Sequence, residues 1–342
     1  MSNSVRIGKW DNVKGALIFL VVLGHVLNLY TSDFKDARIM FLLISTFHMP
    51  LFLFVSGLFS KKTVREKNYK KVVPFLVLYF FIIIIRRVTM IIAKQEFTTH
   101  FFTDDGAQWY CLVLFYYYLI TIALRNVNKK YVMICSITLA CFIGYDPSIG
   151  DFLTLSRTIV FFPFFYLGYC FEPESLEKAF LNIWIRISAA AVLVISVLIV
   201  CAQGDEIYWI RPLLTGRNPF SSLGEEYADY GGLIRFCYYF VSALVSACFI
   251  AIIPNKSKIL TLTGNRSLQI YALHFVVLML LVHKADMINV LAELCPAYHM
   301  WLSIPVTIAI ALFCSIKIFG VPFDYIRRNG IPKSKENSDT RY

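Results

Sequence analysis

The chain has 342 residues, of which 58% are hydrophobic and only 16% charged, and its formal net charge is +11. Soluble globular proteins are nearer to roughly 45–50% apolar and 25% charged, so this composition excludes a disordered protein, a fibre and a soluble globular enzyme. Eight of the nine cysteines lie within apolar runs and none forms a CxxC pair, which indicates small buried residues rather than a disulfide or zinc framework. The sequence predicts a polytopic membrane protein.

Ten apolar runs are long enough to cross a bilayer, whose hydrocarbon core of about 30 Å requires about 20 residues of helix. We expect an all-α integral membrane protein with about ten transmembrane helices, in a single transmembrane domain over 1–320. The tail at 321–342 is short, basic and polar, and we expect it to be disordered. The expected spans are 13–31, 39–59, 72–93, 108–125, 131–146, 155–172, 183–203, 231–253, 267–283 and 299–320.

The distribution of basic residues predicts the orientation of these spans. Ten spans place both termini on one side, and a cytoplasmic N-terminus gives the inner segments 19 of the 33 Lys and Arg residues. The outer segments then hold 6, and 8 lie within the spans. Because cytoplasmic loops of membrane proteins are enriched in Lys and Arg, both termini are predicted to be cytoplasmic in a multi-pass protein of the cell (plasma or inner) membrane.

A histidine in the first span is the most informative polar group, because ionisable side chains inside a bilayer are costly and need a reason. His25 lies near the middle of the span, and Lys14 lies 11 residues earlier at the cytoplasmic end. Eleven residues are three helical turns with a residual offset of about 20°, so the two side chains share one face about 16 Å apart. We expect a groove marked by Lys14 that leads from the cytosol to His25.

His48 in the second span is predicted to lie at the same depth as His25, roughly 17 Å from the cytoplasmic end of its span. Two histidines at matched depth on consecutive helices can face each other across a polar cavity and act in catalysis. The alternative is a pair of buried histidines that bond to the backbone or to neighbouring Ser and Thr residues. His274 in the ninth span is a weaker candidate.

Two further groups of residues are candidates for binding. The loop at 61–71 holds six cations and can bind the phosphates of a cosubstrate beside Lys14, although inner loops of this kind also bind anionic lipid. On the outer side, arginines within spans need an acid or an anionic ligand, or else reach the interface with their side chains. The candidates are Lys61, Lys62, Lys70 and Lys71 for the cosubstrate, and Arg86, Arg157, Trp109 and Trp209 for a substrate.

The order of short motifs along the chain resembles that of the membrane-bound acyltransferase 3 family, from the first span to the ninth. The opening run WDNVKG is most similar to the subgroup of fucose 4-O-acetylase-like and capsular polysaccharide O-acetyltransferases. The matching runs are WDNVKG at 10–15, GH at 24–25, FHMPLFLFVSG at 47–57, KVVP at 71–74, WYCL at 109–112, RTIVFFPFFYLG at 157–168 and GNRSLQIYALH at 264–274.

This resemblance implies transfer of an acetyl group from acetyl-CoA, a cosubstrate rather than a bound cofactor, to a hydroxyl of a cell-surface or exported carbohydrate. The basic residue and histidine that the family spaces by ten residues correspond to Lys14 and His25. Its basic positions before the third span correspond to Lys70 and Lys71, and its arginine at the start of the sixth span to Arg157. Neutral imidazole suits His25 for the role of general base.

Two alternatives remain open at this point. A transporter or flippase of a polysaccharide precursor would use buried His and Arg residues along its pathway, although the sequence shows no internal repeat and no Gly- or Pro-broken helix pair of the transporter kind. A structural partner of a polysaccharide synthase would need neither His25 nor Lys14. No metal site and no nucleic-acid partner is expected, and the surrounding partner is membrane lipid.

Overall fold

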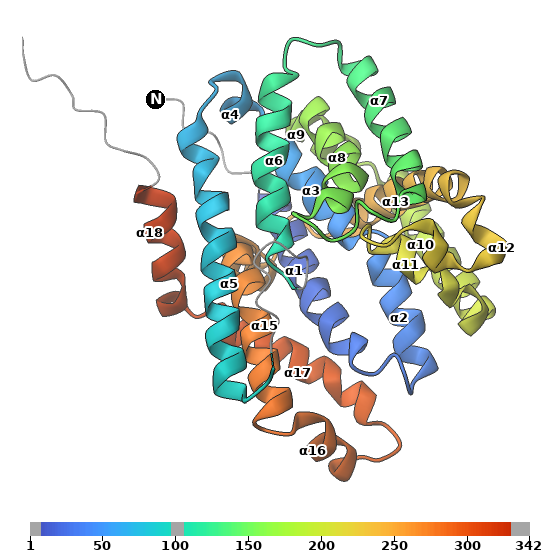
Figure 1. Cartoon of the computed structure of the whole chain (residues 1–342), viewed down its shortest axis with the longest axis vertical. Helices are drawn as coiled ribbons and strands as arrows, with labels where there is room; N and C mark the ends of the chain where they lie inside the picture. The colour runs from blue at the N-terminus through green and yellow to red at the C-terminus, as the bar shows by residue number, and fades with distance from the viewer. Residues whose placement is uncertain (1–7, 97–105, 330–342) are drawn as a thin grey trace, which may run out of the picture.

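The computed structural model describes residues 8–96 and 106–329, and every regular element within these ranges is helical (Figure 1). The prediction of an all-α protein is confirmed for this part of the chain. The helices are α1 (Gly8–Asn28), α2 (Lys35–Ser45), α3 (His48–Leu58), α4 (Lys61–Arg65), η1 (Tyr69–Lys71), α5 (Val73–Ala93), α6 (Trp109–Ala123), α7 (Lys129–Phe142), η2 (Ile143–Tyr145), α8 (Leu155–Cys170), α9 (Pro173–Ala179), α10 (Ile183–Gln203), η3 (Gly204–Ile210), α11 (Arg211–Leu214), η4 (Phe220–Leu223), α12 (Glu225–Ala228), α13 (Gly231–Ile252), α14 (Lys258–Asn265), α15 (Ser267–His283), α16 (Met287–Leu294), α17 (His299–Cys314), η5 (Lys317–Gly320) and α18 (Val321–Asn329).

Five helical stretches of the described chain are long and apolar enough to cross a membrane, and the number rises to seven if each of two bent helix pairs counts as one span. The apolar helices α6 and α8 are shorter, with 15 and 16 residues. The chain is therefore a multi-pass membrane protein, whereas the total of about ten spans stays a prediction. The five stretches are Gly8–Asn28, Lys35–Leu58, Tyr69–Ala93, Ile183–Leu214 and Gly231–Ile252.

Two helix pairs of the described chain are bent at short breaks. Helices α14 and α15 meet at Arg266 with a bend of 80°, and α17 and the helical segment after it meet with a bend of 63°. The last carbonyl groups of a helix have no partner within the helix. At the end of α17 the carbonyl of Cys314 accepts a hydrogen bond of 2.6 Å from Gln269 Nε2. Just after the helix, Ile316 O accepts one of 2.7 Å from the same Nε2, and Ser315 O accepts one from Arg266. These contacts fix the first turn of α15 in its new direction.

The tail after Gly320 begins as a helix, α18, and not as the disordered segment expected from its composition. Phe323 is buried, and its ring lies 5.7 Å from that of Phe81 on α5 in an edge-to-face arrangement. Phe323 anchors this otherwise polar segment against α5, and the composition of the segment does not indicate such a contact. Residues 330–342 lie outside the described part of the chain.

Two helix crossings bring backbones into direct contact at glycines. On α1 and α14, a Cβ atom on Gly15 would overlap the carbonyl of Leu260, and one on Gly264 would overlap that of Asp11. The crossing of α3 and α8 has the same reciprocal form, with Gly57 against Phe165 and Gly168 against Phe54. Small residues allow this close approach, which drives helix association in lipid.

The connections between helices gather at two opposite ends of the molecule. Figure 1 shows α4 and the α6–α7 connection at one end and α16 with the α1–α2 connection at the other. The first two belong to segments predicted to be cytoplasmic, and the last two to segments predicted to be outer. Which side of the membrane each end faces stays a prediction.

We expect Gly57→Ala to lower the free energy of unfolding by about 1–3 kcal/mol or more, because the overlap is with a backbone carbonyl that side-chain rotation cannot relieve. The matched control is Gly150→Ala, whose Cβ would meet no atom closer than 3.8 Å. Thermal unfolding of the two variants in detergent checks this, and equal midpoints would contradict the close-contact account of the α3–α8 crossing.

Candidate functional site

The two histidines of the first and second predicted spans line one cavity of ≈ 350 Å³. His25 comes from the last two turns of α1, and His48 is the first residue of α3, directly after the break that separates α2 from α3. Both side chains are half-buried. The cavity is also lined by Asn28, Phe41, Trp109, Arg157, Arg211, Thr215, Arg217, Tyr271 and Phe275.

The ring of His25 packs against two side chains of α15. The centroid of the His274 ring lies 5.1 Å away with the planes tilted by 42°, and the ring of Phe275 lies 5.8 Å away in an edge-to-face arrangement. The bend at Arg266 directs α15 across α1 at this level. His25 therefore has an imidazole on one side and the cavity on the other.

His274 is fully buried, with 0% of its surface exposed. Its Nδ1 lies 3.1 Å from the carbonyl oxygen of Ile270 one turn earlier. A carbonyl only accepts hydrogen bonds, so Nδ1 carries the proton and Nε2 of the neutral ring is left as an acceptor. Within the described residues Nε2 has no hydrogen-bond partner. A buried acceptor thus lies beside His25.

His48 has features of both alternatives that the sequence left open, a histidine that faces a cavity and a buried histidine that bonds to the backbone. Its Nδ1 bonds to the carbonyl oxygen of Ile44 at 2.7 Å, and its side chain also lines the cavity. The bond to Ile44 spans the break between α2 and α3 and so links the two helices. The role of His48 in catalysis stays a prediction.

Arg157 is held between an aromatic face and a loop. Its guanidinium carbon lies 4.5 Å from the centroid of the Trp109 ring, and its Nε donates a hydrogen bond of 3.0 Å to the carbonyl of Thr215. Trp109 itself is buried and stacks on Phe161 of α8, with ring centroids 5.8 Å apart. The planar fork of arginine suits both contacts at once. The two predicted substrate residues Trp109 and Arg157 are therefore neighbours in the cavity wall.

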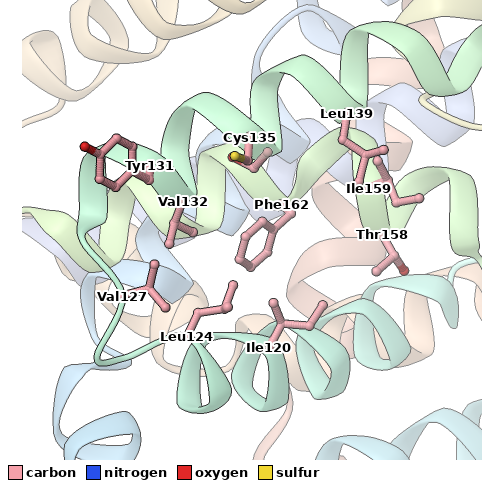
Figure 2. A pocket seen from close by; sticks show the side chains of 11 residues that line it. Ile120, Leu124, Val127, Tyr131, Val132, Cys135, Leu139, Thr158, Ile159 and Phe162 are labelled. Atoms are coloured by element: carbon pink, nitrogen blue, oxygen red, sulfur yellow. The ribbon is translucent and has the colours of Figure 1, made fainter.

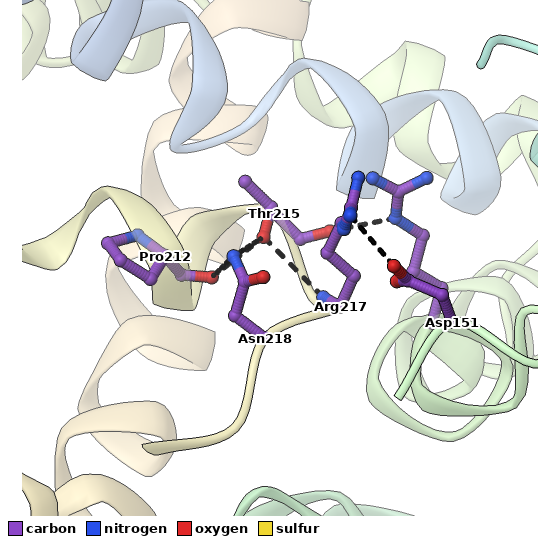
Figure 3. A network of polar contacts seen from close by, with 6 residues as sticks. Asp151, Pro212, Thr215, Arg217 and Asn218 are labelled. Carbon is purple, nitrogen blue, oxygen red and sulfur yellow. Dashed lines mark hydrogen bonds and ion pairs between the residues drawn. The ribbon is translucent and has the colours of Figure 1, made fainter. Parts of the chain in front are cut away.

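Two further arginines, which the sequence analysis did not single out, come from the loop around α11. Arg211 donates to Asn28 Oδ1 at 2.7 Å, one turn beyond His25, and Arg217 forms an ion pair of 2.7 Å with Asp151. Figure 3 shows Arg217 directed toward Asp151 and the Thr215 side chain within bonding distance of its neighbours. Both arginines belong to the few cations of the predicted outer segments, which was the one signal in the sequence that could have indicated them.

The cavity at His25 extends one turn along α1 toward Lys14 and does not reach it. The face of α1 between the two residues carries Ile18 and Val21, which are 0% and 2% exposed, and Val21 also lines the cavity. Lys14 does not line the cavity and forms an ion pair of 2.7 Å with Asp11. A groove over the whole distance between Lys14 and His25 stays a prediction.

Comparison with known proteins gives the family. Residues 7–320 match the acyltransferase 3 family, which is described as an acyltransferase domain. The chain belongs to this family. The nodulation protein NolL of Sinorhizobium fredii (strain NBRC 101917 / NGR234) is 41% identical over 68 residues, which are 19% of this chain and 18% of that protein. No solved structure matches the chain.

The remaining candidates of this acyltransferase 3 chain lie away from the cavity lining or at its margin. Lys61 pairs with Glu172, whereas the side chains of Lys62, Lys70 and Lys71 are exposed. The guanidinium of Arg86 lies 5.4 Å from the ring of Phe275, which itself lines the cavity. Trp209 stacks on Tyr227 with ring centroids 4.0 Å apart and does not line the cavity. The predicted binding roles of these residues stay predictions.

A second cavity, of ≈ 340 Å³, lies between α6, α7 and α8, and its described lining holds no His, Asp or Glu. Figure 2 shows its mostly apolar wall, with Ile120 from α6, Leu139 from α7 and Phe162 from α8, and with Tyr131 and Cys135 from α7. The hydroxyl of Thr158 is directed to the carbonyl of Thr154. Across residues 8–96 and 106–329, no group of three His, Cys, Asp or Glu residues could hold a metal ion. The cavity at His25 is therefore the candidate active site.

Proposed function

We propose that the chain is an O-acetyltransferase that moves an acetyl group from acetyl-CoA to a hydroxyl of a cell-surface or exported carbohydrate, of the capsule or exopolysaccharide type. The observation that supports this most directly is His25, an imidazole that lines a cavity between membrane helices in a chain of an acyltransferase family. A general base held near such a cavity is what ester formation from a thioester requires.

In the proposed reaction, His25 first accepts one proton and later donates it again. The acceptor hydroxyl attacks the carbonyl carbon of the acetyl thioester, and His25 takes the hydroxyl proton as the new C–O bond forms. The C–S bond then breaks, and the departing thiolate of CoA takes the proton back from His25. The ester product and free CoA leave, and the ring returns to its neutral form. Each step needs only one protonatable group within reach of the reacting atoms.

His274 acts in this mechanism as a positioning residue. Its free Nε2 is an acceptor beside His25, so it can hold the second ring nitrogen of His25 in the protonated state that leaves the other nitrogen free for the hydroxyl. The same contact stabilises the imidazolium that forms when His25 takes the proton. The bend at Arg266 directs α15 so that His274 lies next to His25.

The donor binds, in this proposal, at the basic end of the molecule. Lys14, Lys61, Lys62, Lys70 and Lys71 provide the charge for the phosphates of CoA in a protein oriented with both termini in the cytoplasm of the cell (plasma or inner) membrane. Lys14 does not line the cavity, so in this proposal the acetyl arm spans the distance from the basic end to the cavity wall at Val21.

We expect His25→Ala to reduce acetyl transfer by about 10²–10⁴-fold, because the general base is lost. Membranes containing the variant are incubated with labelled acetyl-CoA, and the label in carbohydrate is counted. The control is His283→Ala, an exposed histidine at the end of α15. Full transfer by the His25 variant would remove the base from the mechanism. No label in carbohydrate with the unmodified chain, together with loss of polysaccharide export in its absence, would favour a transporter or flippase.

We expect the replacement of His274 to lower kcat and to leave KM for acetyl-CoA nearly unchanged, since His274 contacts His25 and not the donor. His274→Phe keeps an aromatic ring without an acceptor and should lose about ten-fold or more in kcat. His274→Gln keeps an acceptor and should recover part of that loss. Equal kcat values for the two variants, both near the unmodified level, would contradict a hydrogen-bonded role.

We expect Lys70→Gln combined with Lys71→Gln to raise KM for acetyl-CoA several-fold at low salt, with kcat retained and the difference shrinking as salt is added. The matched control is Lys129→Gln combined with Lys130→Gln, a second basic pair in a predicted inner segment. An equal rise in KM for both pairs would indicate a general surface charge effect and no donor site at 61–71.

A further inference from the structure

We propose that Asn28 is a further catalytic residue, whose side-chain amide donates a hydrogen bond to the carbonyl oxygen of the acetyl group as that oxygen becomes negatively charged. This inference rests on the proposed function and deepens it at the same site. Asn28 is the last residue of α1, and it lines the cavity together with His25. In this proposal His25 handles the proton of the reaction and Asn28 the developing charge.

The bond between Asn28 and Arg211 determines which end of the amide is available. Nη2 of Arg211 donates to the side-chain oxygen of Asn28 at 2.7 Å. A guanidinium group has only donors, so the amide oxygen faces Arg211 and the NH₂ group points away from it. Within residues 8–96 and 106–329 the NH₂ group has no hydrogen-bond partner. Asn28 therefore brings N–H donors to the cavity that the described part of the chain does not use.

Arg211 is itself held in place, which fixes the amide before any reaction takes place. Its guanidinium carbon lies 5.3 Å from the centroid of the Phe41 ring and 5.7 Å from that of the Tyr208 ring. These rings belong to α2 and η3, so Arg211 links the end of α1 to both elements. Donors that are fixed in advance stabilise a developing charge best. Because hydrogen bonds in a chain polarise one another, a cation on the amide oxygen also makes the N–H groups stronger donors.

The spacing of His25 and Asn28 fits a general base and a donor to the oxyanion. Residues three apart on a helix lie on the same face, with Cβ atoms about 5–6 Å apart. The base must come within about 3 Å of the acceptor hydroxyl, and the donor within about 3 Å of the carbonyl oxygen. Since both oxygens are bonded to one carbon in the tetrahedral intermediate, side chains one helical turn apart match the separation that the reaction requires.

Other neutral donors at the cavity are engaged or come from other helices. The hydroxyl of Thr215 donates to the carbonyl of Pro212 at 2.7 Å, and Nδ1 of His48 donates to the carbonyl of Ile44 at 2.7 Å. Ser45 also lines the cavity, but it belongs to α2. Among the described lining residues, Asn28 therefore combines available N–H donors with a place on the same helix face as the base.

The role of Asn28 in the reaction is electrostatic. The hydroxyl oxygen bonds to the carbonyl carbon of the thioester, its proton passes to His25, and one electron pair of the C=O bond moves to the carbonyl oxygen. Asn28 donates to this oxygen. When the electron pair returns, the C–S bond breaks and the thiolate of CoA takes the proton from His25. One donor of this kind typically contributes about 10²–10³-fold to kcat.

Three substitutions separate this role from a structural one. Asn28→Asp keeps an oxygen for Arg211 but has no N–H donor, and Asn28→Ala loses both the donor and the bond to Arg211. Arg211→Gln keeps the amide but holds it less firmly. We expect Asn28→Asp and Asn28→Ala to lose about 10²–10³-fold in kcat, and Arg211→Gln about ten-fold or less. KM for acetyl-CoA should stay nearly unchanged in all three, because the interaction forms only in the transition state.

The matched control is Asn182→Asp, the same chemical change at the N-cap of α10. The side chain of Asn182 accepts a hydrogen bond of 2.9 Å from the backbone N–H of Trp184, and Asp caps a helix about as well as Asn. This variant should keep the rate and the thermal unfolding midpoint of the unmodified chain. The midpoint of Asn28→Asp should also be retained, since its bond to Arg211 becomes an ion pair.

Transfer near the unmodified rate by Asn28→Asp would overturn the proposal, because Asn28 would then only hold Arg211 in place. A large loss confined to Asn28→Asp would also overturn it, since the added charge would be the cause. If Asn28→Asp does not fold, a loss in Asn28→Ala well beyond that in Arg211→Gln supports the proposal, and equal losses contradict it. Absence of transfer by the unmodified chain would refute the proposed function as a whole, whereas the other contrary outcomes refute only the role of Asn28.

Discussion

The direct contact of helix backbones at glycines determines where the polar side chains of this protein lie. Gly15 and Gly264 join α1 to α14 immediately before the bend at Arg266, so the position of α15, and with it His274, depends on that contact. Gly57 and Gly168 join α3 to α8 in the same way, and these two helices carry His48 and Arg157. In lipid there is little hydrophobic drive between helices, so close packing of this kind supplies the precision that a buried site needs.

Polar groups are costly within a bilayer, and this chain concentrates them. His25 and His48 line one cavity together with Arg157, and His274 on a third helix is buried beside His25. Each has a contact that explains its presence: a carbonyl one turn earlier, an aromatic face, or another imidazole. The cost of placing these groups in the membrane is thereby reduced but not removed, which is the condition expected of a functional site rather than of a packing interior.

The sequence was sufficient where the argument depended on periodicity and depth. Apolar runs predicted the helices, and counting residues from the span ends brought His25 and His48 to the same level, where the structure has them lining one cavity. The sequence did not predict the features that depend on contacts between segments far apart in the chain. The bend at Arg266 depends on the carbonyls at the end of α17, some 50 residues later, and the place of Arg211 depends on Asn28 of α1. No local pattern contains either contact. The same holds for Ile18 and Val21, whose burial depends on partners that the periodicity of α1 does not reveal.

The packed segment between Lys14 and His25 has a chemical consequence for a transferase. A thioester is open to attack by any deprotonated hydroxyl, including that of water, so a base that shares an aqueous path with the donor would promote wasteful hydrolysis. Ile18 is fully buried between the level of Lys14 and the cavity, whose lining begins at Val21 and includes His25. Under the proposed role of His25 as general base, the group that it deprotonates is one that lies in this cavity. In this proposal, discrimination between the acceptor and water follows from the shape and the charge of the cavity, more than from the reactivity of the base itself.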